Sequence, residues 1–214
     1  MTNRIVWPCP PHAAGLTLER DPHLDNGPQL ADAINDGDFA HTDWVSDDER
    51  DAAIRTNRCW VLHWYPNTPV GFCSIAASST EALIAYFRQE NEPFTEMTLL
   101  DPGHSECLTL EHNDHKSIYS SVEDEVGDGS VSVATGGRQG IYSAFAWADD
   151  AEKQRAIDSD EAWALTVRPS HPNLVKHDPR IVRIAASTLD ALNAAVDRGM
   201  ARAPDAPPAA RPQE

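Results

Sequence analysis

The sequence repeats itself at nearly constant offsets. The segment 16–19, Leu-Thr-Leu-Glu, recurs 92 residues later at 108–111, and the segment 75–78, Ile-Ala-Ala-Ser, recurs 109 residues later at 184–187. Self-similarity of this kind is the signature of a repeated structural unit, and it predicts a tandem duplication of a module of about 90 residues. Between the two blocks the matching residues lie 103 positions apart: Trp44 and Trp147, Ala53 and Ala156, Trp60 and Trp163.

The offsets also predict where the modules begin and end. We expect the first module in residues 1–90 and the second in residues 91–200, with residues 88–96 as the linker. The offset grows at two places, which predicts insertions in the second module near residues 130–146 and 173–178. Residues 201–214 are rich in Ala and Pro and have no apolar pattern, so we expect a disordered tail.

Within one module, the periodicity of apolar residues predicts the order strand, helix, helix, strand, strand, helix. Ser46 and Glu49 have the spacing of a capping box. We therefore expect the Ser46 hydroxyl to accept one backbone N–H and the Glu49 carboxylate to reach back to another. In the first module the expected elements are a strand at 15–20, a helix at 28–35, a helix from 46, a hairpin at 60–65 and 70–77, and a helix after 79.

These modules predict an α+β fold. A three-stranded sheet that helices cover on one face still has another face and two edges to protect. Two copies in one chain achieve this by pairing around a pseudo-twofold axis, as the subunits of an isologous dimer do. Tryptophans present in both copies are expected to be core anchors. They are Trp44, Trp60, Trp147 and Trp163.

The charge of the chain limits the partners it can have. Thirty-four acidic residues against 17 basic ones give a net charge of −17. A field of that sign repels phosphate backbones and anionic membranes, so we expect no direct nucleic-acid or membrane binding and favour a basic protein partner. The alternative is that the excess acid only keeps the protein soluble. No apolar segment has the length of a membrane span or of a signal-peptide core, so a cytoplasmic location is expected.

Two features of the first module are candidate binding sites. The first is an acidic cluster, and the second is an aromatic hairpin tip braced by proline, which has no counterpart in the second module. Large rigid aromatic side chains suit protein contacts, although they could instead pack on the neighbouring module. The cluster comprises Asp47, Asp48, Glu49 and Asp51, and the tip comprises Trp64, Tyr65, Pro66 and Asn67.

One set of residues that bind metals in other proteins occurs in both copies. Imidazole nitrogens and carboxylate oxygens are common ligands of zinc and iron. The alternative is that the histidines hydrogen-bond loop carbonyls. The chain contains no Walker loop, no Gly-x-Ser-x-Gly elbow and no His-Glu-x-x-His motif, and nothing in it predicts a cofactor. The metal candidates are His12, Glu19 and His23 in the first copy and His104, Glu111 and His115 in the second.

Together these features favour a non-enzymatic binding or inhibitory protein that blocks a basic, nucleic-acid-handling partner. At the level of composition only, the chain resembles small accessory proteins of phages and mobile elements, which would place it in the host cytoplasm. Two alternatives stay open. One is a metal-dependent enzyme that uses the duplicated His/Glu/His set. The other is a structural, self-assembling protein in which the duplication mimics a pair of subunits.

Overall fold

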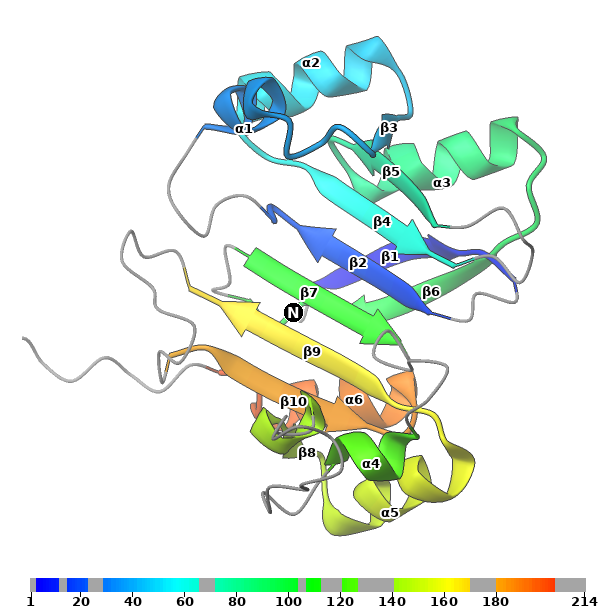
Figure 1. The fold of residues 1–214 in the computed structure, drawn as a ribbon, viewed down its shortest axis with the longest axis vertical. Helices are drawn as coiled ribbons and strands as arrows, with labels where there is room; N and C mark the ends of the chain where they lie inside the picture. Colours follow the sequence, from blue (N-terminus) through cyan, green and yellow to red (C-terminus); the bar gives the residue numbers. More distant parts are fainter. Residues whose placement is uncertain are drawn as a thin grey trace, which may run out of the picture.

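The two halves of the chain are joined by two pairs of antiparallel strands, each with one strand from either half (Figure 1). The computed structural model describes residues 3–11, 15–22, 29–65, 72–103, 107–112, 121–126, 141–169 and 180–202. The first half contains β1 (Arg4–Cys9), β2 (Leu16–Arg20), α1 (Leu30–Asp36), β3 (Asp43–Trp44), α2 (Asp47–Thr56), β4 (Trp60–Trp64), β5 (Cys73–Ala77) and α3 (Thr80–Gln89). The second half contains β6 (Thr95–Leu100), β7 (Cys107–His112), α4 (Val122–Val126), a 3-10 helix (Ile141–Ala144), β8 (Ala146–Trp147), α5 (Asp150–Ser159), β9 (Trp163–Arg168), β10 (Val182–Ala186) and α6 (Leu189–Asp197).

Among the described residues, eight strands form the main sheet in the order β3-β5-β4-β2-β7-β9-β10-β8. The central strands β2 and β7 are antiparallel, with Leu18 opposite Leu110. Strands β1 and β6 form a separate antiparallel ribbon, with Val6 opposite Thr98. In both pairs the two residues are 92 positions apart, which is the offset of the first sequence repeat. Each half of the chain therefore contributes strands to both sheets.

The structure contains four strands that the sequence did not predict, namely β1, β3, β6 and β8. Strands β3 and β8 have two residues each and exist only through parallel pairing with β5 and β10, so no local periodicity could indicate them. Strand β6 begins inside the segment expected to be a linker. In the described part of the first half the element order is therefore β-β-α-β-α-β-β-α.

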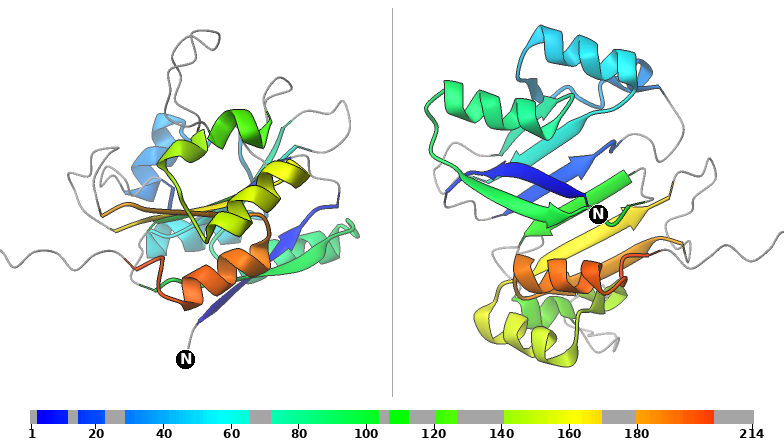
Figure 2. Two further views of the ribbon diagram at one scale, coloured as in Figure 1. Left: turned by 90° about the horizontal axis from the view of Figure 1, so that it is seen from below. Right: turned by 180° about the vertical axis from the view of Figure 1, so that it is seen from behind.

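The two faces of the main sheet are covered differently. On one face, which we call the covered face, Leu18, Leu62, Leu110 and Leu165 are fully buried. They belong to the main core, which packs against α3, α6 and the β1–β6 ribbon (Figure 2). No described helix is both long and apolar enough to cross a bilayer.

The opposite face has two smaller cores, one near each edge of the sheet. One core joins Val61 and Ala76 to α1 and α2, and the other joins Ala164 and Ala185 to α5 and α4. Figure 1 looks onto this face and places these helices at its two ends, with no described helix over β2 and β7. The middle of the face therefore has no described helix packed on it.

The start of α2 confirms half of the expected capping box. Ser46 Oγ accepts the Glu49 N–H at 3.2 Å. The Glu49 carboxylate, however, does not reach back along the helix, and accepts the Ser78 N–H at 3.0 Å and the Ser78 hydroxyl instead. Water can satisfy an exposed amide at a helix start, but a part-buried amide at the end of β5 needs a protein acceptor. The expected capping role of the Glu49 carboxylate was therefore wrong.

The second half contains the same arrangement. Glu152 accepts the Ser187 N–H at 3.0 Å and the Ser187 hydroxyl, and it also contacts Arg155. Burial raises the pKa of Glu152, but the hydrogen bonds from Ser187 and Arg155 outweigh that effect and hold the pKa below its ordinary value. These two carboxylates tie the second helix of each half to the strand that precedes its last helix.

Candidate functional site

Strand alternation gathers polar side chains in the middle of the less covered face. Thr17 lies opposite His63 on one side and opposite Glu111 on the other. Residues directly opposite in neighbouring strands project from the same face of a sheet. We call this surface the open face, because no described helix packs on its middle. Its described polar members are Thr17, Glu19, His63, Ser74, Thr109, Glu111, Thr166, Arg168 and Arg183, of which Thr17, Ser74 and Thr166 are buried.

The helices that flank the open face contain most of the acidic residues found in the described α-helices. Helices α1, α2, α4 and α5 contain twelve acidic and four basic residues. We call these four the acidic helices. Helices α3 and α6, on the covered face, contain three acidic residues and one basic residue. The described helices beside the open face therefore carry more net negative charge than those on the covered face.

The predicted acidic cluster lies at the start of α2. Asp47, Asp48 and Asp51 are exposed, whereas Glu49 is half-buried and bonded to Ser78. Three of the four carboxylates are therefore available to a partner, and the fourth has a structural contact.

The predicted hairpin tip is divided between the two faces. Trp64 is half-buried and its ring lies 5.7 Å from that of Phe87 in α3, on the covered face. Tyr65 is 46% exposed and lies 5.2 Å from the ring of Phe72, which is 47% exposed. We call Tyr65 and Phe72 the aromatic tip. Pro66 and Asn67 lie outside the described residues.

A cavity of about 310 Å³ opens beside the aromatic tip. In its lining, His63 Nε2 lies 3.4 Å from Glu19 Oε2. Thr109, outside the lining, donates from its hydroxyl to Glu19 Oε1 at 3.5 Å. The ring of Phe72 stacks on that of His63 at 5.2 Å. We call this cavity the His63 pocket; it is lined by Glu19, Pro22, Asp38, Phe39, Thr42, Val61 and His63.

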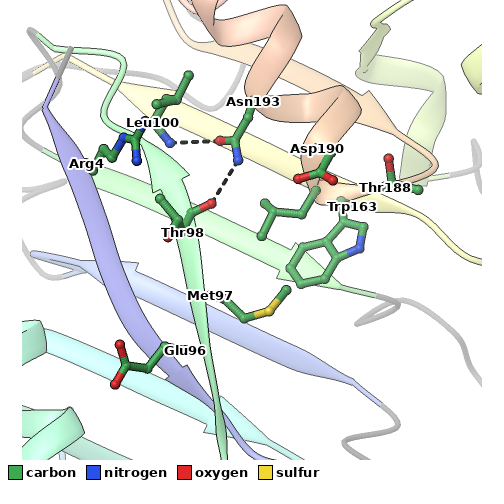
Figure 3. A pocket seen from close by; sticks show the side chains of 10 residues that line it. Arg4, Glu96, Met97, Thr98, Leu100, Trp163, Thr188, Asp190 and Asn193 are labelled. Atoms are coloured by element: carbon green, nitrogen blue, oxygen red, sulfur yellow. Dashed lines mark hydrogen bonds between the residues drawn. The ribbon is translucent and has the colours of Figure 1, made fainter. Parts of the chain in front are cut away.

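A larger cavity, of about 630 Å³, lies between β6 and α6 on the opposite side of the main sheet (Figure 3). Asn193 of α6 donates to the Thr98 carbonyl and accepts the Leu100 N–H, both at 2.8 Å. The side-chain amide thus satisfies the outer edge of β6 as a neighbouring strand would. The position 109 residues earlier holds Ile84, which is buried. This cavity lies away from the acidic helices, and its polar centre already has a structural role.

Of the six residues predicted as metal ligands, the structure describes only the two glutamates. Glu19 and Glu111 are diagonal neighbours on β2 and β7, about 7–8 Å apart by the usual geometry of paired strands. His12, His23, His104 and His115 lie outside the described residues. Within the described part of the chain, no group of three or more His, Cys, Asp or Glu side chains is arranged to hold a metal ion. The imidazole that meets Glu19 is that of His63.

We expect the purified protein to contain no stoichiometric zinc, iron or manganese, and a chelator to leave its melting temperature unchanged. Elemental analysis and thermal melting with and without EDTA measure both. Metal at one or two equivalents per chain that is lost in His23→Ala or His115→Ala would contradict this expectation, because metal binding that stabilises the folded state raises its melting temperature.

Comparisons of the chain with protein-family models, with curated proteins and with solved structures found no significant match. Its function therefore has to be argued from the chemistry of the site rather than from the fold.

Sequence reasoning missed His63, Phe72 and the residues after α1 that complete the pocket. One signal was available, because alternation from Val61 through His63 to Tyr65 places all three on one face of a strand. No local pattern could have placed Asp38 and Phe39 beside Glu19, since that contact depends on how α1 packs on the sheet.

Proposed function

We propose that this chain is a non-enzymatic binding or inhibitory protein that covers a basic surface of a protein partner with its open face. The observation that carries the proposal is the distribution of charge, twelve acidic against four basic residues, on the helices at the two ends of that face. Charge arranged around one surface steers a partner of opposite sign to that surface.

The chemistry of the open face supports this function. Interfaces gain most of their binding energy from a few aromatic and charged residues surrounded by polar contacts. The aromatic tip supplies two exposed rings beside a polar surface, and the exposed carboxylates of α2 supply the steering charge. A partner that handles nucleic acid has a positively charged groove, and an acidic face that occupies the groove excludes the nucleic acid. Blocking such a partner would suit the phage and mobile-element accessory proteins that this chain resembles in composition.

We also propose that the chain is a tandem duplication whose copies pair as an intrachain pseudo-twofold dimer. The strand order supports this origin, because reading outward from β2 gives β4, β5 and β3, and reading outward from β7 gives β9, β10 and β8. Leu18 and Leu110 face each other at the repeat offset, as do Val6 and Thr98. A twofold axis through both pairs relates the two sequence copies.

The test of the proposed function is the salt dependence of partner association. Affinity capture from the native cell identifies the partner, and binding kinetics are then measured from low to physiological salt. We expect the on-rate to fall steeply over this range, because exposed charges are screened beyond about 8–10 Å at physiological salt. An on-rate that does not change with salt contradicts steering.

Charge variants locate the steering surface. The triple variant Asp47→Asn, Asp48→Asn and Asp51→Asn should slow association by up to about tenfold and leave the melting temperature nearly unchanged. The matched control is Glu81→Gln, Asp190→Asn and Asp197→Asn, which removes the same net charge from exposed positions on α3 and α6. Equal slowing by both triples would show that only net charge matters. Tyr65→Ala, in contrast, should mainly speed dissociation.

A further inference from the structure

We propose that the His63 pocket is the receptor for one arginine side chain of the basic partner. The inference rests on the proposed function and names the chemical group that the open face recognises. It depends on three observations: the charge of the pocket, its aromatic wall, and its restriction to the first half of the chain.

The charge of the pocket favours a cation. Two carboxylates, those of Glu19 and Asp38, line the cavity, and none of the described lining residues is Lys or Arg. The side chain of Glu19 is 26% exposed, so its oxygens remain accessible from the cavity. A guanidinium group binds two carboxylate oxygens through parallel N–H donors, which makes it the cation best matched to this lining.

The imidazole of His63 lies beside the carboxylate of Glu19 in the cavity. Its Nε2 lies 3.4 Å from Glu19 Oε2, close enough to orient that carboxylate. The other nitrogen, Nδ1, is buried and has no hydrogen-bond partner within the described structure. Because Nδ1 is buried, a ligand in the cavity would contact the carboxylate of Glu19 rather than this nitrogen.

The aromatic wall results from the way α1 ends. Gly37 adopts the left-handed conformation, with φ of 93°, and turns the chain out of the helix. Glycine adopts this conformation without the steric cost that other residues incur. The turn brings Asp38 and Phe39 to the pocket, and the Phe39 ring packs at 5.7 Å from that of Trp44. A fixed aromatic ring beside carboxylates is a surface on which a planar guanidinium can stack.

The second half has a different set of side chains at the equivalent positions. At the repeat offsets, His63 corresponds to Thr166 and Ser74 corresponds to Arg183. Arg183 lies in β10 and is part-buried, and desolvation together with the nearby Arg168 lowers its pKa. Two arginines among the described residues of that half disfavour a cation there, so the proposed arginine site is confined to the first half.

The test is a titration of the full-length protein with Nα-acetyl-arginine methyl ester, followed by NMR signals of Phe39 and by the ¹⁵N shifts of the His63 ring. We expect saturable shifts at both residues, including the Nε2 that faces Glu19. The citrulline ester has nearly the same shape without the charge, and the lysine ester has the charge without the planar group. Binding of either analogue as tightly as the arginine ester would overturn the proposal.

The decisive variants are Glu19→Gln and Asp38→Asn. Each should weaken binding of the arginine ester, Glu19→Gln by about tenfold, as expected for the loss of a charge-assisted hydrogen bond. The matched control is Glu111→Gln, the same change on the neighbouring strand of the open face but outside the pocket lining. Equal weakening by Glu111→Gln would overturn the site assignment. Asp38 is exposed, so its variant keeps the test valid if Glu19→Gln proves unstable.

Failure of this inference can be distinguished from failure of the proposed function. The ester titration needs no partner, so a pocket that binds no arginine leaves the salt dependence of partner association untouched. Conversely, an on-rate that ignores salt and the α2 charge triple rejects the steering function, even if the pocket binds the ester.

Discussion

Trp163→Ala should lower the free energy of unfolding by about 3–5 kcal/mol, the usual cost of truncating a buried tryptophan. Trp163 is 7% exposed and belongs to the main core. Its ring stacks on His112 at 4.3 Å and lies 6.3 Å from the ring of Trp7, so it connects β9 to β7 and to the β1–β6 ribbon. It also lines the cavity beside α6, which the truncation would enlarge rather than close.

The matched control is Trp60→Ala at the position 103 residues earlier. Trp60 is half-buried, so its truncation removes less buried surface. The Arg20 guanidinium lies over its ring, 5.5 Å from the ring centroid. We therefore expect a clearly smaller loss for Trp60→Ala, measured for both variants by urea unfolding. A Trp163→Ala protein that unfolds like the wild type would mean that this tryptophan is not a core anchor.

Much of the secondary structure could be predicted from the sequence because core positions recur with regular periods. Strands β2 and β7 alternate apolar and polar residues over Leu-Thr-Leu-Glu, and α3 and α6 follow polar caps and carry an apolar stripe. The four missed strands have a different physical origin. Strands β3 and β8 arise from pairing with distant segments, and β1 and β6 pair with each other across the two halves of the chain.

The candidate site was predictable only in part, for a related reason. Charge is a property of each residue, so the exposed carboxylates of α2 could be identified directly from the sequence. The His63 pocket depends instead on tertiary contacts, since it combines side chains from β2, β4 and the segment after α1. Trp64 and Tyr65 are adjacent in the sequence, yet strand alternation directs them to opposite faces, so only Tyr65 belongs to the aromatic tip.

Neither half of the chain should fold when it is expressed alone, whereas fragments 1–92 and 93–214 produced together should form a stable heterodimer. The division falls between α3 and β6, outside every described strand and helix. Strands β2 and β7 pair across it, and so do β1 and β6. An isolated half would expose the edge of its central strand and its part of the main core, a combination that favours aggregation over folding.

Circular dichroism, size-exclusion chromatography and NMR of each fragment, alone and combined, measure this outcome. Because folding would then require association, the melting temperature of the fragment pair should rise with protein concentration, whereas that of the intact chain should not. A single fragment that melts cooperatively and gives dispersed NMR signals would mean that the module folds without its partner. The pairing of β2 with β7 would then be a docking contact between two independent domains. Failure of both fragments alone, with recovery on mixing, would instead mean that the linker supplies only the high local concentration of one half near the other.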